Sequence, residues 1–363
     1  MKIITIVGAR PQFVKAAMIS QAIVNHNRDN NNPIEECMLH TGQHYDETMN
    51  AVFFEKLEIP QPSWQLNCGG GSHAEMTARM LIEIEKILQE NRPDYVLVYG
   101  DTNSTLAGAL AASKLHIPVV HVEAGLRSFN RQMPEEINRT LTDHLSKYLF
   151  CPTQVSILNL KNEGITEGVF HVGDVMYDAA ITFGKIAELT SNILSTLQLE
   201  KKQFYLCTVH RAENTDNSER LSQIMEALVE IARTDCPVIL PLHPRTKKYV
   251  DSRQIESNKA FRLIEPVDYL AMIMLEKNAK TILTDSGGVQ KEAYFHKTPC
   301  ITLRDETEWV ETITAGWNQL AGYRKESIFL CLENNLQQSV IEEYGNGRAA
   351  DKIIQTLLHN GGF

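Results

Sequence analysis

Short, uninterrupted apolar runs recur along the chain, and each is followed by a polar turn and a stretch with helical spacing. The runs cover residues 3–8, 95–100, 118–125, 148–153, 204–210, 237–243, 281–288 and 299–305. Strands that are buried on both faces have this continuous pattern, which is typical of parallel sheets covered by helices. Helical spacing is found over residues 13–25, 74–89, 104–115, 135–148, 220–233, 289–295 and 346–360.

The alternation of strands and helices predicts an α/β protein with doubly wound sheets. The pattern weakens over residues 179–202 and restarts near residue 204. We therefore expect one Rossmann-like domain over residues 1–172 and a second over 173–345, followed by a last helix within 346–363. Two such domains leave a cleft between them, and ligands of this architecture bind at the carboxyl ends of strands.

Composition excludes several classes of partner. The chain has 363 residues, with 35 Lys and Arg against 45 Asp and Glu, so its formal charge is −10. This balance argues against a surface that binds nucleic acid or anionic lipid, although it permits a local basic pocket. The seven cysteines include no C-x-x-C pair, which fits a reducing cytoplasm and indicates no zinc site. No signal peptide and no run of membrane-spanning length is evident.

Four loops at predicted strand ends carry groups that suit a diphosphate. A helix start with glycines and a hydroxyl presents free backbone N–H groups to an anion, and cationic side chains add to its attraction. The candidate side chains and backbone positions are Arg10, Lys15, His210, Arg211, His243, Ser286, Gly287 and Gly288, and Glu292 suits ribose hydroxyls. Each loop alone also fits an ordinary strand–helix turn or a helix cap. Their combination favours a site for an anionic ligand.

Three carboxylates lie at predicted strand ends or helix starts of the N-terminal half. Asp101 also fits a helix cap, and Glu135 also fits the favourable first turn of a helix. Glu123 lies in an apolar strand end, where an unpaired carboxylate is costly. A function, or a partner such as Arg127, would explain it. Several carboxylates in one closed site favour general acid–base chemistry, and no spacing of metal ligands competes with that interpretation.

Nine sequence blocks, in order and over essentially the whole chain, resemble the non-hydrolysing UDP-N-acetylglucosamine 2-epimerase family. They are residues 8–17, 41–44, 100–105, 121–128, 133–139, 171–178, 210–214, 284–293 and 304–308. The resemblance implies a fold similar to GT-B glycosyltransferases, with two Rossmann-like domains facing across a cleft and the final helix, 346–363, packed back on the first domain. It also implies a homodimer and no metal or nicotinamide.

The reaction implied by this resemblance inverts C2 of a UDP-2-acetamido sugar. UDP is eliminated to give a 2-acetamidoglycal, and it adds back after a proton returns to the opposite face of C2. Asp101, Glu123 and Glu135 match the candidate acid–base groups, and His210 matches a histidine at the diphosphate. Which carboxylate is the base stays open. The positions that match phosphate and ribose contacts are Ser286, Gly287, Gly288 and Glu292.

Two departures from the family pattern concern the sugar. The segment Ser128–Pro134 is short, and Trp309-Val310 replaces the usual Arg-Pro. Both resemble the branch that acts on UDP-2,3-diacetamido-2,3-dideoxy-glucuronic acid for O-antigen or capsule. Its C6 carboxylate requires a cation, for which Arg131 is the candidate, although a solvated loop arginine is the alternative. The residues assigned to the sugar and to specificity are Gln43, His44, Arg127, Arg131, Asn138, Arg304 and Thr307.

Other functions stay open at this point. The substrate can instead be UDP-N-acetylglucosamine, and the family resemblance also implies substrate activation through a second site near residues 41–44. There Tyr45-Asp46 departs from the pattern, which weakens that expectation. A GT-B glycosyltransferase would need an acceptor site and no set of three carboxylates. A hydrolysing 2-epimerase would release UDP, and a non-catalytic sensor would not need intact acid–base groups. A cytoplasmic enzyme with a UDP-sugar substrate is the expectation.

Overall fold

The computed structural model describes residues 1–29, 32–43, 59–234, 236–253, 255 and 257–360. The chain forms two compact units: unit 1 is Met1–Ala179 with Glu342–Phe363, and unit 2 is Ala180–Ile341. The first division therefore lies inside helix α7 (Val175–Thr190), at the start of the weak stretch 179–202 and beyond the boundary expected at residue 172. The first turns of α7 belong to unit 1 because Asp178 accepts a hydrogen bond from the backbone N–H of Ala350 at 2.8 Å.

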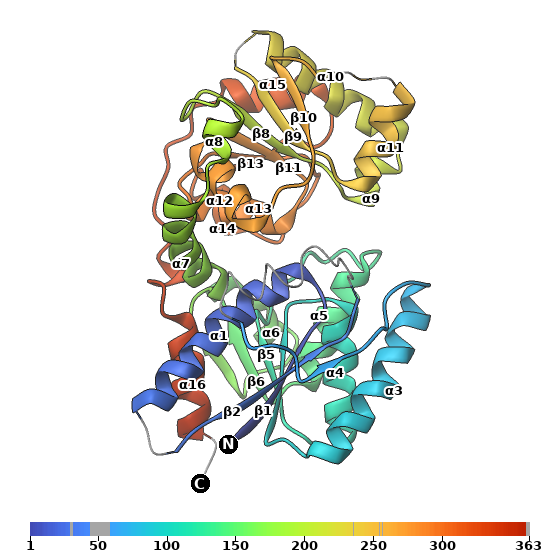
Figure 1. Ribbon diagram of the computed structural model, residues 1–363, viewed down its shortest axis with the longest axis vertical. Coiled ribbons are helices and arrows are strands. Elements are labelled where there is room, and N and C mark those ends of the chain that lie inside the picture. Colours follow the sequence, from blue (N-terminus) through green and yellow to red (C-terminus); the bar gives the residue numbers. More distant parts are fainter. Residues whose placement is uncertain (30–31, 44–58, 235, 254, 256, 361–363) are drawn as a thin grey trace. The chain divides into compact units, whose positions relative to one another are not determined.

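Unit 1 contains a seven-stranded sheet in the order β3-β2-β1-β4-β5-β6-β7, in which every pair is parallel. Its strands are β1 (Lys2–Val7), β2 (Glu35–His40), β3 (Trp64–Gln65), β4 (Tyr95–Tyr99), β5 (Val119–Val122), β6 (Tyr148–Cys151) and β7 (Val169–His171). Its other elements are α1 (Arg10–Asp29), α3 (His73–Asn91), α4 (Asn103–Lys114), α5 (Pro134–Leu145), α6 (Gln154–Asn162), the 3-10 turn η1 (Glu342–Tyr344) and α16 (Ala349–Asn360). The C-terminal helix α16 packs against α1 (Figure 1).

Unit 2 repeats this plan with a six-stranded sheet in the order β10-β9-β8-β11-β12-β13, again with every pair parallel. Its strands are β8 (Tyr205–Thr208), β9 (Val238–Pro241), β10 (Phe261–Ile264), β11 (Thr281–Thr284), β12 (Cys300–Thr302) and β13 (Asn318–Leu320). Its helices are α8 (Ile193–Thr196), α9 (Ala212–Thr215), α10 (Ser218–Thr234), α11 (Pro244–Arg253), α12 (Tyr269–Asn278), α13 (Gly287–Phe295), α14 (Val310–Thr314) and α15 (Lys325–Glu333).

The central strands are buried throughout, as their continuous apolar runs predict. All residues of β4, β5, β6 and β8 are buried, and the helices on both faces exclude water from them. The expected fold class is confirmed: an α/β protein with two Rossmann-like parallel sheets. In the part of the chain that the structure describes, no helix combines the length and the apolar character needed to cross a membrane.

Each sheet has a switch point at its first strand. β1 lies between β2 and β4, and β8 lies between β9 and β11, so the chain leaves the first strand in one direction and later returns on its other side. The loops that follow these neighbouring strands diverge at the carboxyl edge of the sheet and leave a crevice for ligands. The helix start after β1 approaches α4 so closely that position 8 has no room for a side chain. A Cβ atom on Gly8 would clash with the Ser104 and Thr41 hydroxyls.

Candidate active site

Glu123 directly follows β5 and pairs with Lys15 of α1. The Nζ atom of Lys15 contacts Oε1 of Glu123, and their side chains are only 7% and 13% exposed. Glu123 has a φ of +71°, a strained value for a residue with a side chain, and such strain is concentrated at functional sites. Lys15, Glu123 and Asp174 line a small hollow of about 10 Å³, which is the size of one water molecule.

The sequence suggested Arg127 as the partner of Glu123, and this prediction is wrong. The guanidinium of Arg127 instead donates to Asp143 at 2.7 Å and, through two nitrogens, to Glu163 at 2.7 Å. Arg127 follows Glu123 by four positions, but the turn at Gly125 directs it toward α5 and α6. These contacts bind the guanidinium to the protein itself, so Arg127 stabilises the loop after β5.

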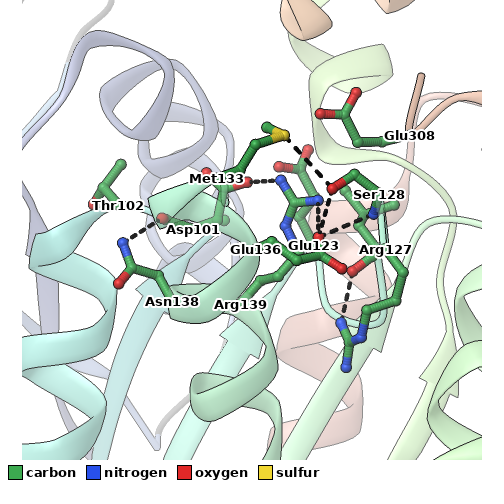
Figure 2. A network of polar contacts seen from close by, with 12 residues as sticks. Asp101, Thr102, Glu123, Arg127, Ser128, Met133, Glu136, Asn138, Arg139 and Glu308 are labelled. Carbon is green, nitrogen blue, oxygen red and sulfur yellow. Dashed lines mark hydrogen bonds and ion pairs between the residues drawn. The ribbon is translucent and has the colours of Figure 1, made fainter. Parts of the chain in front are cut away.

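Asp101 follows β4 and forms an ion pair with Arg139 of α5 (Figure 2). Asn138 donates to the backbone carbonyl of Asp101 at 3.0 Å. The alternative that Asp101 caps α4 does not hold, because Thr102 is the N-cap and forms a capping box with Thr105. The Asp101 carboxylate is consequently held by a cation at the sheet edge and is partly exposed.

Glu135 and Glu136 open α5, and the structure gives them different surroundings. Glu136 is 3% exposed and accepts hydrogen bonds from the backbone N–H groups of Ser128 and Phe129, both at 2.9 Å. Arg139 donates to the same carboxylate at 2.9 Å (Figure 2). Among the described residues Glu135 has no polar partner and is partly exposed. The sequence did not separate the two roles: Glu136 holds the loop after β5, and Glu135 stays available to a ligand.

The remaining predicted residues of unit 1 lie at the same edge or outside the described residues. Gln43 accepts hydrogen bonds from the backbone N–H and hydroxyl of Ser104, at 2.9 and 2.7 Å, and so holds the start of α4. His44 lies outside the described residues, as does Tyr45-Asp46. Arg10 is the first residue of α1 and is partly exposed. Arg131 is exposed in the loop before α5.

His121 of β5 links α5 to the loop after β4 at the carboxyl edge of the sheet. This positioning role was not predicted from the sequence. The Nδ1 atom of His121 lies 2.7 Å from the Asp143 carboxylate, and its Nε2 atom lies 2.7 Å from the carbonyl oxygen of Gly100. Gly100 precedes Asp101 and has a φ of +60°, which favours glycine. The ring therefore fixes the turn that presents Asp101. A histidine inside a buried apolar strand was the signal that could have found it.

In unit 2, Asp285 positions the loop after β8. Its carboxylate is fully buried and accepts hydrogen bonds from the backbone N–H groups of His210 and Arg211, each at 3.0 Å. Asn214 donates to it at 3.1 Å. Burial lowers the pKa of His210, and neighbouring cations, among them Arg211, lower it further, while Asp285 opposes them. The neutral imidazole of His210 is therefore favoured in the folded protein.

The start of α13 presents free backbone N–H groups beside this loop. Ser286 is the N-cap, and its hydroxyl accepts from the N–H of Val289 at 3.5 Å. Gly287 and Gly288 form the first turn, and a Cβ atom on Gly288 would make only an ordinary contact with the Ser286 hydroxyl oxygen, at 3.9 Å. Glu292 lies one turn later and is 9% exposed. His243, at the end of β9, lies with its ring centroid 5.5 Å from that of His210.

Arg304 and Thr307 were predicted as sugar contacts. Both side chains are buried and bonded to other residues of unit 2. Arg304 is fully buried and donates to Glu308 at 3.0 Å, with Glu213 at 3.5 Å from its Nε atom. Thr307 donates to the side chain of Gln290 at 2.6 Å. Arg304, Thr307 and Glu308 are buried and form a network that supports the loop after β12.

One hollow in unit 2 lies away from these residues. It has a volume of about 580 Å³ and is lined by residues such as Tyr205, Thr281 and Cys300, the first residues of β8, β11 and β12. It is thus at the amino ends of the strands, and the predicted site residues do not line it. Parallel sheets bind ligands at the opposite edge, so we assign this hollow no part in the site. Within the described ranges no cluster of side chains suits a metal ion.

Comparison with known proteins shows to which family the chain belongs. A family model described as UDP-N-acetylglucosamine 2-epimerase matches residues 26–358. The chain belongs to this family. It is a UDP-sugar 2-epimerase of the non-hydrolysing kind, as the sequence blocks indicate. The family assignment agrees with the carboxylates at the edge of unit 1 and the free backbone N–H groups at the start of α13 in unit 2.

The relatives divide between two substrates. The chain is 50% identical to the UDP-2,3-diacetamido-2,3-dideoxy-D-glucuronate 2-epimerase of Pseudomonas aeruginosa, over 98% of this chain and 99% of that one. It is 48% identical to the UDP-N-acetylglucosamine 2-epimerase of Methanocaldococcus jannaschii, over 99% of each. The crystal structure of a Methanocaldococcus jannaschii UDP-GlcNAc 2-epimerase in complex with UDP-GlcNAc and UDP superposes with a TM-score of 0.91, covering 99% of this chain and 100% of that one.

Proposed function

We propose that this enzyme inverts C2 of UDP-2,3-diacetamido-2,3-dideoxy-glucuronic acid to give the manno epimer. The observation that carries this choice of substrate is Arg131, an exposed guanidinium without an ion-pair partner in the described part of the chain. It lies in the short loop that Glu136 fixes at Ser128 and Phe129. A uronate carries a C6 carboxylate, and an arginine binds a carboxylate through two parallel hydrogen bonds.

The carboxylates of unit 1 suit the proton transfers at C2. In the forward direction, the C1–O bond breaks with its electrons moving to the β-phosphate oxygen of UDP, and a base takes the C2 proton. A double bond forms between C1 and C2. A proton then returns to the opposite face of C2, and the UDP oxygen bonds to C1 again. Two faces require at least two groups, and Asp101, Glu123 and Glu135 are the candidates that we assign to them.

The groups of unit 2 suit the departing UDP. The backbone N–H groups at Gly287 and Gly288 and the Arg211 guanidinium stabilise negative charge as it develops on the diphosphate. We assign the same task to Arg10, Lys15 and His243. A neutral His210 can accept a proton, or donate an N–H hydrogen bond, near the β-phosphate oxygen of the departing UDP. Glu292, one turn into α13, is assigned to the ribose hydroxyls.

The experiment that tests the substrate compares two sugars and two variants. We expect the wild-type enzyme to have a higher kcat/KM with the diacetamido uronate than with UDP-N-acetylglucosamine. Arg131→Gln should lower kcat/KM for the uronate by about tenfold or more, because a charged hydrogen-bonded pair is lost. Its activity with UDP-N-acetylglucosamine should not change. Arg28→Gln, an exposed arginine at the end of α1, is the matched control and should change neither activity.

UDP-N-acetylglucosamine is the second candidate substrate. It is favoured by the 48% identity to an enzyme named for that substrate and by the fold shared with its crystal structure. A higher kcat/KM of the wild type with UDP-N-acetylglucosamine would overturn our choice. So would an Arg131→Gln variant that retains wild-type activity with the uronate.

The setting of the reaction is part of the same proposal. We propose that the product serves a surface polysaccharide such as an O-antigen or capsule, and that the enzyme works in the cytoplasm as a homodimer. The resemblance to the family supports each of these points. Sedimentation analysis tests the oligomer: a dimer mass is expected, and a monomer that is fully active would contradict it.

A further inference from the structure

Trp309 carries a buried polar atom that has no hydrogen-bond partner among the described residues. Its side chain lies in the loop before α14 and is only 4% exposed, yet among the described residues its indole Nε1–H has no acceptor. Leaving a buried donor unpaired destabilises the folded protein. Trp317 of the same unit avoids this cost, because its Nε1–H donates to the carbonyl oxygen of Ser339 at 2.7 Å.

The unpaired atom lies beside the start of α13. A Cβ atom built on Gly287 would be 3.6 Å from Nε1 of Trp309 and also 3.6 Å from Nη2 of Arg211. Gly287 is the first residue of this nine-residue helix, where free backbone N–H groups attract anions. An indole donor and a guanidinium therefore converge on the position where a phosphate is expected.

A buried lysine strengthens the donor. Lys291, on the next turn of α13, is 2% exposed, and its Nζ atom lies 4.0 Å from the centroid of the Trp309 ring. A cation over an indole face is attractive. Its positive field also withdraws electron density from the ring, so the N–H becomes a better donor to an anion. Thr307 holds the backbone of Trp309 in place, because the Thr307 hydroxyl accepts a hydrogen bond from the backbone N–H of Trp309 at 3.1 Å.

The carboxylate of Glu308 would repel an anion at this position, but Arg304 neutralises its charge. Oε2 of Glu308 is also 3.6 Å from the position of a Cβ on Gly287. Arg304 donates to that same oxygen at 3.0 Å, so the carboxylate is balanced by a fully buried cation. Arg211, whose side chain is 25% exposed, lies next to the indole and has room to turn toward a ligand.

We propose that Trp309 recognises the diphosphate of the substrate directly. Its Nε1–H donates a hydrogen bond to an anionic oxygen bound at the start of α13, with Lys291 polarising the ring from its face and Arg211 pairing with the same phosphate. The identity of the anion as UDP rests on the proposed function. The convergence of donors on Gly287 does not depend on which sugar UDP carries.

The first test removes only the donor. Trp309→Phe keeps an aromatic ring over Lys291 but has no N–H. Calorimetric titration of the full chain with UDP should show a Kd about tenfold to 100-fold higher than that of the wild type. The melting temperature of the free variant should be unchanged or higher, because an unpaired buried donor has been removed. A role in folding alone would instead lower the melting temperature and leave the Kd unchanged, and that result would overturn the proposal.

Trp317→Phe is the matched control. It breaks the hydrogen bond to Ser339 and should lower the melting temperature without changing the Kd of UDP. Lys291→Met removes the cation beneath the ring, and its Kd should rise by a smaller factor than that of Trp309→Phe. A Lys291→Met variant that binds UDP as the wild type does would remove the lysine from the proposal.

A spectroscopic measurement on the wild type covers the case in which Trp309→Phe fails to fold. The chain has only three tryptophans, so its indole N–H signals can be resolved by NMR and assigned with the variants. On titration with UDP the Trp309 signal should move downfield, as expected for a new bond to an anion. A signal that does not move while UDP binds would refute the proposal. A wild-type protein that does not bind UDP would instead refute the proposed function.

Discussion

The two units have the same sheet plan and opposite chemistry at their switch points. In unit 1 the loops after β4 and β5 and the start of α5 present carboxylates, of which Asp101 and Glu123 are each paired with one cation. In unit 2 the carboxylate of Asp285 is buried and accepts the backbone N–H groups of His210 and Arg211, whose side chains are partly exposed. Under the proposed function, one architecture thus provides an edge for proton transfer and an edge for anion binding.

The difference shows that the scaffold sets where chemistry takes place and the loops set which chemistry it is. Glu136 in unit 1 and Asp285 in unit 2 do the same work, since each accepts two backbone N–H groups of a neighbouring loop. Both are buried carboxylates that a reader of the sequence would count as candidate catalysts. Their hydrogen bonds show that they position other residues instead.

The largest expected effect breaks the proton chemistry of unit 1 alone. Glu123→Gln should lower kcat by about 1,000-fold, because an amide cannot exchange a proton at C2. The Kd of UDP should change far less than kcat, since the groups assigned to UDP in unit 2 are intact and only the Lys15 partner of Glu123 is disturbed. Steady-state kinetics and calorimetry measure the two quantities.

Glu163→Gln is the control for that variant, because Glu163 is a partly exposed carboxylate of the same unit that pairs with Arg127. It should retain its activity. If Glu123→Gln keeps wild-type kcat, Glu123 is not a catalytic group.

A second prediction concerns the free energy of unfolding at acid pH, which should fall in both units for the same reason. Burial lowers the pKa of His40 in unit 1 and of His296 in unit 2 to about 4 each. The unfolded chain binds a proton near the ordinary value of 6.5, and the folded chain does so only near 4. The free energy of unfolding should therefore fall as the pH drops from 6.5 to about 4, by up to about 3 kcal/mol for each histidine.

Urea unfolding at several pH values tests this point. His40→Leu and His296→Leu should each flatten the dependence of the unfolding free energy on pH in the unit that carries the substitution. A dependence that both variants share with the wild type would show that other groups cause it.

A smaller effect is expected from the buried carboxylate of unit 2. Asp285→Asn replaces one acceptor oxygen with an NH2 group that opposes the N–H groups of His210 and Arg211. The loop should lose its fixed geometry, and the Kd of UDP should rise by about tenfold. Asp305→Asn is a control, since that carboxylate is exposed and pairs with Arg220. An unchanged Kd in Asp285→Asn would show that the loop does not need this support.

The central strands and the larger helices could be predicted from the sequence because burial on both faces leaves an unbroken apolar run. The edge strands could not. β7 and β10 are partly exposed, and β3 has two residues, so their runs are too short or too mixed to stand out. Helix α7 lies partly in the stretch interpreted as weak, and it contributes to both units.

For the site, the sequence located the loops but not the partners within them. Glu123 was singled out because a carboxylate in a buried strand end must be paired, yet its partner Lys15 lies 108 positions away and only the parallel sheet brings them together. Glu135 and Glu136 are adjacent in sequence, and the helix turns their side chains in different directions. The role proposed for Trp309 rests on the absence of an acceptor, which no sequence pattern reports.

Incubation with the UDP-diacetamido uronate in deuterated water tests most directly the claim that unit 1 moves a proton at C2 while unit 2 retains UDP. The account predicts that deuterium enters C2 of the epimerised product and that the product remains a UDP-sugar. NMR of the sugar and chromatography of the nucleotide follow the two outcomes. Accumulation of free UDP with a free sugar, or a product without deuterium at C2, would contradict the account.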